Sequence, residues 1–138
     1  MATNSELIAL IGQFGTEHIE VREVLEKIDA GVDARDSDVV QSALASGSGV
    51  LVAGLDEHSS AEDIVLFPGI ASMLGEAMIE VFVEEHVRIL ALRNQIYANL
   101  EKGIADFDGC ADFSELLTSH IDREDSMLFP AAIGVLAD

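Results

Sequence analysis

The stretch His58-Ser-Ser-Ala-Glu62-Asp-Ile-Val-Leu-Phe-Pro68 occurs twice in this chain. The second copy reads His120-Ile-Asp-Arg-Glu124-Asp-Ser-Met-Leu-Phe-Pro130, with His, Glu, Asp, Leu, Phe and Pro at the same offsets. On a helix, a residue and the one four places later lie one above the other on the same face. Each copy can therefore direct an imidazole and a carboxylate towards one point. Each copy also ends in a proline that we expect to stop its helix.

Each copy is preceded by a segment that carries one further histidine in an acidic setting. These segments are Thr16-Glu17-His18-Ile19 and Glu84-Glu85-His86-Val87, and they complete the 4 histidines of the chain. A lone core histidine is more often hydrogen-bonded than ligating, and a single His-x-x-x-Glu is common by chance. Two copies in register, each with a further inward histidine, instead favour a metal site, because burying so many polar side chains is costly unless something compensates them.

The composition indicates an all-helical chain. Apolar residues make up 49% of the 138 residues, only 5% are aromatic and only 2 are proline, which suits helices better than sheets. The length fits a single domain over residues 1–138. Four amphipathic segments with short connections predict an up-down-up-down four-helix bundle. We also expect a short C-terminal helix over residues 131–138.

The helix boundaries follow from capping signals and breaks in the apolar spacing. The first helix begins after the capping-box sequence at residues 3–6 and fades at Gly31. The second runs from residue 37 or 38 to Pro68, with a bend or close contact at residues 46–49. The third covers residues 76–102, with Gly103 as its C-cap, and the fourth ends at Pro130.

The inward stripes contain all six histidines and glutamates of the pattern, and they also predict inward positions for Val65, Met127 and Leu128. When residues are counted along each helix from the connection between the first and second helices, His58 lies several residues farther from that connection than His18. At ~1.5 Å per residue the mismatch is about 10 Å. The two imidazoles lean towards each other in antiparallel neighbours, which removes part of the gap, and a longer first helix or a distortion of the second helix at residues 46–49 would remove the rest.

Imidazole and carboxylate ligands without thiolate fit iron, manganese or zinc. Two ions bridged by two carboxylates, with open positions, suit redox-active iron, whereas structural zinc sites are usually closed and four-coordinate. Ferritin-type bundles carry Glu-x-x-His and more glutamates, so they fit this ligand order poorly. Asp63 and Asp125 recur at one repeat position, and we expect them to hydrogen-bond ligating histidines of neighbouring helices. We expect the other flanking acids, Glu17, Glu84 and Glu85, to be surface charges.

The ordered pattern resembles that of the haemerythrin-like (HHE cation-binding) domain family, in the variant with four histidine and two glutamate ligands. The residues that carry the resemblance are His18, His58, Glu62, His86, His120 and Glu124. It covers nearly the whole chain and implies a four-helix bundle around a non-haem di-iron centre. By that resemblance His18 and His58 hold one iron, and His86 and His120 the other. Glu62 and Glu124 bridge the two ions together with an oxo or hydroxo group.

The pattern differs from that of the oxygen-carrying haemerythrins of invertebrates, which use five histidines and a bridging aspartate. The second iron is then less crowded, which favours peroxide or nitric oxide chemistry over simple oxygen carriage. We therefore expect a di-iron protein that binds or turns over a small oxidant: peroxide, dioxygen or nitric oxide, in oxidative or nitrosative stress. Catalase-like peroxide decomposition is one outcome, and the sequence leaves open whether the protein is an enzyme. The alternatives are an iron-storage or iron- or oxygen-sensing module, and an iron donor for cluster repair.

No catalytic residue is assigned beyond the metal centre. Tyr97 lies ~16 Å along the helix axis from His86, and we expect a core residue with a wet hydroxyl. We expect Arg93 to pair with a carboxylate, and Cys110 to be a small apolar residue near a helix start.

The charge balance excludes some partners. Lys+Arg 7 against Asp+Glu 26 give a net charge of -19, which repels nucleic acid and anionic membranes. The single cysteine excludes an internal disulfide and fits a reducing compartment. With no signal-like stretch at the start, we expect a soluble cytoplasmic protein. The sequence does not indicate an oligomeric state or a protein partner.

Overall fold

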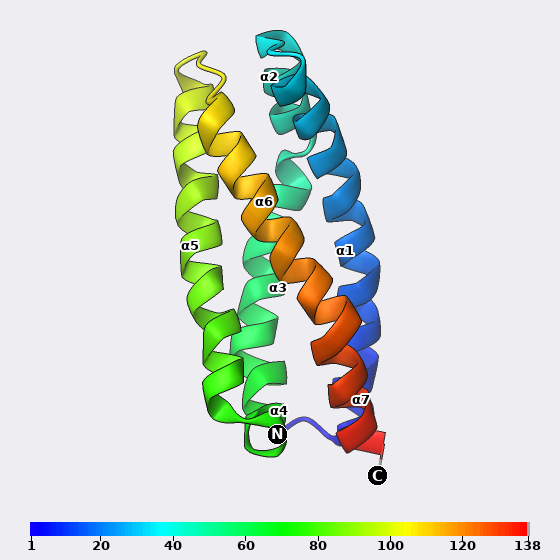
Figure 1. Ribbon diagram of the computed structural model, residues 1–138. Helices are drawn as coiled ribbons and strands as arrows, with labels where there is room; N and C mark the ends of the chain where they lie inside the picture. Colours follow the sequence, from blue (N-terminus) through cyan, green and yellow to red (C-terminus); the bar gives the residue numbers. More distant parts are fainter. Residues whose placement is uncertain (138) are drawn as a thin grey trace.

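The structure is a computed structural model that describes residues 1–137, and every regular element in those residues is helical. Helical segments run back and forth along one long axis, and both chain ends lie at the same end of the molecule (Figure 1). The first segment is α1 (Asn4–Asp33). The second comprises α2 (Ser37–Ser46), η1 (Gly49–Gly54), α3 (Leu55–Ala61), η2 (Glu62–Leu66) and α4 (Phe67–Leu74). Then follow α5 (Glu76–Glu101), α6 (Phe107–Arg123), η3 (Glu124–Leu128) and α7 (Phe129–Ala137), where η marks a π-helical turn.

The predicted caps are present at the helix ends. Thr3 Oγ1 accepts the backbone N–H of Glu6 at 3.1 Å, and the Glu6 carboxylate accepts the N–H of Thr3 at 3.3 Å, which confirms the capping box. Gly103 has φ +74, in the left-handed region that favours glycine, directly after the end of α5. At the start of α6, Asp106 accepts the N–H of Gly109 at 2.9 Å.

The prediction that Pro68 and Pro130 stop their helices is wrong. Each is the second residue of a helix that begins after a π turn, and those helices continue to Leu74 and Ala137. A proline is tolerated in the first turn of a helix, where its missing N–H has no intrahelical acceptor to lose. The expected C-terminal helix is present, although it begins already at Phe129.

Of the predicted inward positions after each His-x-x-x-Glu, Leu128 is confirmed, whereas Val65 and Met127 are wrong. Val65 and Met127 are 39% and 42% exposed, whereas Leu66 and Leu128 are fully buried. The π turns η2 and η3 begin at Glu62 and Glu124. A π turn takes one more residue than an α turn, so the next inward side chain falls one place later.

The expected bend in the second segment lies at Gly47, but it ends α2 at Ser46 and so divides the segment, where one continuous bent helix was predicted. Here α2 meets the segment Gly49–Leu74 at 58°. A Cβ at Gly47 would lie 2.5 Å from a methyl group of Val24, so the glycine permits a close approach to α1. Helix α2 is about 15 Å long, and its tilt reduces its advance along the axis to about half. This removes most of the expected mismatch between His18 and His58.

The core consists of two apolar clusters with a layer of buried polar side chains between them. Towards the chain ends the cluster is rich in phenylalanine, and towards α2 it is mainly aliphatic. The polar layer contains His18, His58, Glu62, His86, His120 and Glu124. No single described helix is long and apolar enough to cross a membrane, and only the bent pair Ser37–Ser46 with Gly49–Leu74 passes that test, by length and composition.

Candidate metal centre

The six predicted ligands meet in the polar layer. His18 comes from α1, His58 from α3, His86 from α5 and His120 from α6, while the two glutamates begin η2 and η3. Every one of these side chains is buried; His58, at 7%, is the most exposed. The sequence pattern explains the convergence, because each histidine and the glutamate four places later share one helix face.

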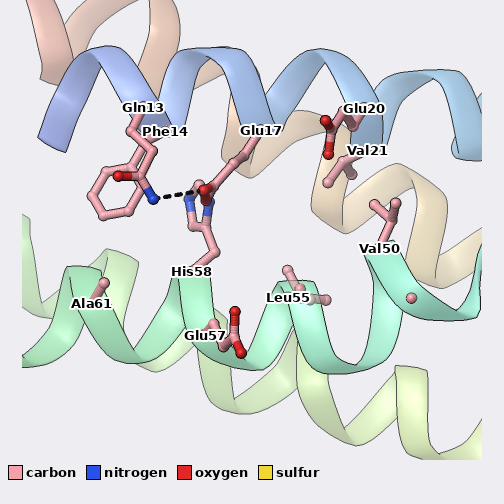
Figure 2. Close-up of a pocket in the computed structure, with 12 residues that line it drawn as sticks. Gln13, Phe14, Glu17, Glu20, Val21, Val50, Leu55, Glu57, His58 and Ala61 are labelled. Atoms are coloured by element: carbon pink, nitrogen blue, oxygen red, sulfur yellow. Dashed lines mark hydrogen bonds and ion pairs between the residues drawn. The ribbon is translucent and has the colours of Figure 1, made fainter.

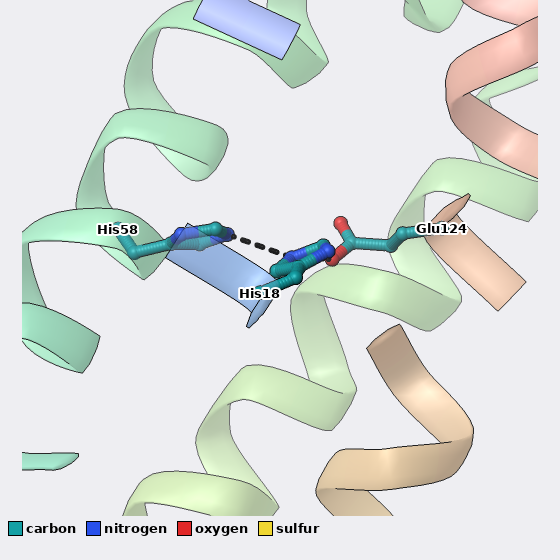
Figure 3. A group of neighbouring side chains, drawn as sticks. All are labelled: His18, His58 and Glu124. Atoms are coloured by element: carbon teal, nitrogen blue, oxygen red, sulfur yellow. Dashed lines mark hydrogen bonds and ion pairs between the residues drawn. The ribbon is translucent and has the colours of Figure 1, made fainter. Parts of the chain in front are cut away.

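The side chains form two groups whose ligand atoms all lie within 4.8 Å of one another: His18, His58 and Glu124, and Glu62, His86 and His120. In the first group, His18 Nε2 lies 3.3 Å from His58 Nε2 and 3.3 Å from Glu124 Oε1 (Figure 3). In the second, His86 Nε2 lies 3.1 Å from Glu62 Oε1.

The two glutamates connect the groups. Glu62 Oε1 also lies 3.3 Å from His58 Nε2 of the first group. Glu124 Oε1 lies 3.4 Å from His120 Nε2 of the second. Each carboxylate therefore contacts one histidine from each group, which is the position that a bridging carboxylate needs.

The donor set fits metal cations and lacks another means of compensation. Among residues 1–137, Glu62 Oε2, His120 Nε2 and both carboxylate oxygens of Glu124 are buried without a hydrogen-bond partner. Each such group costs roughly 1–3 kcal/mol, and more when it is charged. Two imidazole Nε2 atoms at 3.3 Å also repel each other when both carry lone pairs. Cations between the groups would remove both penalties.

Each histidine is oriented by a carboxylate of a neighbouring helical segment. Asp63 and Asp125 bind His86 Nδ1 and His18 Nδ1 at 2.8 Å each, as predicted. When Nδ1–H donates to a carboxylate, a neutral imidazole keeps the lone pair of Nε2 for a metal. This tautomer directs the Nε2 atom of both histidines into the centre.

The other two histidines are held by acids that the sequence analysis assigned to the surface, and that expectation is wrong. Glu17 binds His58 Nδ1 at 2.9 Å, and Glu85 binds His120 Nδ1 at 2.8 Å. A second repeat could have revealed them, because Phe14-x-x-Glu17-His18 recurs as Phe82-x-x-Glu85-His86. Glu84 is exposed, as expected.

Three further side chains hold these carboxylates. Arg22 donates to Asp125 Oδ2 at 2.8 Å, and Arg123 donates to Glu85. Gln13 donates to Glu17 at 2.9 Å. Of the four outer carboxylates, which are those that contact a histidine Nδ1, two are thus paired with arginine. Glu17 instead accepts a hydrogen bond from the side-chain amide of Gln13.

Phenylalanines cover the centre on the side of the chain ends. Their rings lie 4.4 to 5.8 Å, centroid to centroid, from the histidines in four pairs: Phe14 with His58, Phe129 with His18, Phe67 with His86 and Phe82 with His120. These rings keep water away from that side and strengthen the electrostatic interactions inside.

Burial and mutual repulsion separate the pKa values of the two glutamates. Burial, and then the charge of Glu62, raise the pKa of Glu124 well above its usual range. For Glu62, burial is outweighed by the neighbouring Glu124 and the histidines His58 and His86, and its pKa is lowered. Burial and the nearby His86 lower the pKa of His120 to about 4, which keeps its imidazole neutral at pH 7.

The other polar residues considered in the sequence lie outside the centre. Tyr97 donates to the backbone carbonyl of Leu44 at 2.7 Å, so the expectation of a wet hydroxyl is wrong; burial raises its pKa to about 12. Arg93 pairs with Asp56 at 2.7 Å, as expected. Cys110 is buried at the start of α6, and burial raises the pKa of its thiol to about 11.

Buried imidazoles and carboxylates that converge between helices define an all-helical metal-binding protein. The sequence matches the family model of the Hemerythrin HHE cation binding domain over residues 9–132, a range that contains all six residues of the centre. The chain belongs to this family. No curated protein and no solved structure matches it.

Proposed function

We propose that the chain binds two iron ions between the two ligand groups and uses them to bind or turn over a small oxidant. The observation that supports this most directly is the set of buried, unpartnered ligand atoms on Glu62, His120 and Glu124. Imidazole with carboxylate and no thiolate is a donor set that suits iron. The proposal also interprets the antiparallel helical segments as one up-down-up-down four-helix bundle.

In this proposal His18 and His58 would hold one iron, His86 and His120 would hold the other, and Glu62 and Glu124 would be shared between the two ions. The iron pair, when bound, supplies redox chemistry. The outer carboxylates Glu17, Asp63, Glu85 and Asp125 direct the imidazole Nε2 atoms inward. The protein also excludes water on one side with the phenylalanine rings.

The other side of the centre offers room for a small ligand. A cavity of about 10 Å³ adjoins the six ligands, and its remaining wall consists of Val21, Leu55, Ser59, Ile89, Leu117 and Ile121. A space of this size holds about one water-sized molecule, so peroxide, dioxygen or nitric oxide would enter it only with a movement of the side chains in its wall. Apolar walls favour an uncharged ligand. The hydroxyl of Ser59 can donate one hydrogen bond to it.

Metal analysis and peroxide turnover test this proposal together. Anaerobic loading with ferrous iron should give two ions per chain, and a Glu62→Ala, Glu124→Ala double variant should retain few. Adding peroxide while dissolved oxygen is followed then distinguishes an enzyme from a binding module. Sustained oxygen evolution indicates a catalase-like enzyme, whereas a spectral change without turnover indicates a binding or sensing module. One zinc ion per chain would contradict the di-iron proposal.

A further inference from the structure

The two halves of the centre differ in what covers their second histidine. Beside His58, a groove of about 200 Å³ lies between α1 and the segment formed by η1 and α3 (Figure 2). Glu17 and His58 reach towards each other across it, and Val21, Val50 and Leu55 line it farther along. The corresponding surface between α5 and α6 is a shallow depression that is larger, about 590 Å³, but flatter, and its lining does not include His120.

Two substitutions between the repeats explain this difference. Gly54 and Ala61 line the groove, and the second copy has Leu116 and Arg123 at the corresponding positions. Arg123 extends over the ring of Phe82, 5.4 Å from its centroid, and donates to Glu85 beside His120. The larger side chains therefore cover the second half, whereas glycine and alanine leave the first half open.

The groove and the inner cavity are separated by very few atoms. Val21, Leu55 and His58 line both spaces. Val21 and Leu55 therefore form part of the wall between the two spaces. Rotations of such side chains are fast compared with most ligand-binding steps.

The mouth of the groove is acidic. Glu20 and Glu57 are exposed in its lining, next to Glu17. Their counterparts in the second half are Arg88 and Ser119. A cleft with one sign of charge repels ligands of the same sign, so this mouth disfavours anions and leaves uncharged molecules unaffected.

We propose that this groove is the access route by which a small uncharged oxidant reaches the centre, with Val21 and Leu55 as the gate that limits ligand size. This inference deepens the proposed function and rests on it. It assigns ligand selectivity to Val21 and Leu55, which are not among the six predicted metal ligands. It also predicts that ligands approach from the side of His58 alone.

Blocking the groove tests the route. Val50→Phe places a ring in the groove without touching the six ligands, and Ala91→Phe places the same ring in the shallow depression of the other half. The measurement is the association rate of nitric oxide with the ferrous, iron-loaded protein in stopped flow. We expect Val50→Phe to slow association by ~10-fold or more, and Ala91→Phe to change it less than ~2-fold. Equal rates for the two variants would overturn the route.

Widening the gate should have the opposite effect on the association rate of nitric oxide. Val21→Ala should accelerate nitric oxide association several-fold. Its counterpart Ile89→Ala enlarges the same inner cavity on the closed side, where no groove adjoins it. The ratio of the two rates therefore separates the opening of the route from a change in cavity volume. An equal acceleration in both variants would contradict the gate.

A measurement without redox chemistry tests the route independently of the proposed function. In the zinc-loaded protein, dissolved dioxygen acts as a paramagnetic probe that broadens the methyl NMR signals it reaches. We expect broadening at Val21, Leu55 and Ile89 in the natural sequence, and its loss at Ile89 in Val50→Phe. If the iron-loaded protein reacted with none of nitric oxide, dioxygen and peroxide, the proposed function would fail, and this NMR result alone would still decide the route.

Discussion

At the scale of single residues, the centre depends as much on the outer carboxylates as on the ligands. Asp63 and Asp125 were predictable because they belong to the longer repeat and follow each glutamate. Glu17 and Glu85 were not recognised, since acidic residues beside a histidine are common in a chain with 26 of them. Only the Phe-x-x-Glu-His repeat distinguishes Glu85, which aligns with Glu17, from its neighbour Glu84, which aligns with Thr16.

This adjacent pair provides a matched test. Glu85→Ala removes the acceptor of His120 Nδ1 and the partner of Arg123, whereas Glu84→Ala removes an exposed charge of the same sign. We expect Glu85→Ala to lower iron affinity by ~10- to 100-fold, as is typical for carboxylates that orient a ligating histidine. Competition with a chelator measures the affinity. Glu85→Gln should restore part of it through the amide oxygen, and an equal loss in Glu84→Ala would show a general charge effect instead.

At the scale of helices, most of the fold was predictable and the π turns were not. The stripe from Leu7 to Ile28 and the cap at Gly103 follow from spacing and glycine conformation. The continuation of the helices through Pro68 and Pro130 depends on the preceding π turns, which place both prolines in a first helical turn. No residue preference used in the sequence analysis predicts a π turn, and the two turns that precede the prolines begin at Glu62 and Glu124.

The bend at Gly47 gives an element-scale prediction. A Cβ there would lie 2.5 Å from Val24 Cγ1 and 2.9 Å from the carbonyl oxygen of Ala43, whereas a Cβ at Gly49 meets nothing within 4 Å. We expect Gly47→Ala to lower the free energy of unfolding by roughly 1–3 kcal/mol through overpacking. Gly49→Ala should leave it unchanged or raise it by up to ~1 kcal/mol through helix propensity. Urea unfolding monitored by circular dichroism compares them, and equal effects would exclude close packing as the cause.

The start of α6 predicts a pH dependence. Hydrogen bonds from Gln95, the backbone N–H of Gly109 and Asn99 lower the pKa of Asp106 below its ordinary 3.8. A lowered folded pKa means that the stabilisation is present above that ordinary value and is lost as the pH falls through the folded pKa. At pH 7, Asp106→Ala should reduce the free energy of unfolding of the metal-free protein by about 1 kcal/mol.

The difference between Asp106→Ala and the natural sequence should then shrink as the pH falls below 3.8. Asp112→Ala, an exposed change in the same helix, serves as the control for lost negative charge. If the difference between Asp106→Ala and the natural protein stayed constant down to pH ~2, the cap would not act through its ionised carboxylate.

At the scale of the whole molecule, the duplication produces a closed ring. Acids on α1, η2, α5 and η3 each hold the histidine of the next segment, and the last one, Asp125, returns to His18 on α1. The same order applies to the four phenylalanine contacts. The repeat therefore builds one centre from two similar halves, and the halves differ chiefly in the side chains that cover them.

The net charge of -19 and the acidic groove mouth together predict how anions reach the centre. Azide should associate slowly with the oxidised, iron-loaded protein at low salt, and faster as salt screens the mouth over the Debye length of ~10 Å at 0.1 M. Replacing Glu20 and Glu57 by glutamine should raise the azide rate at low salt and flatten its salt dependence. The control replaces Glu23 and Glu26, exposed glutamates of α1 outside the groove, which removes equal charge.

The comparison of the two double variants shows whether azide responds to the local charge of the groove mouth or to the net charge of the whole protein. If both accelerated azide equally, the overall charge would control association and the mouth would have no special role. If only the groove variant did so, while nitric oxide association stayed the same in both, the field would act at the place where the anion passes. We expect this second result, because Glu20 and Glu57 lie in the groove lining that ends at His58.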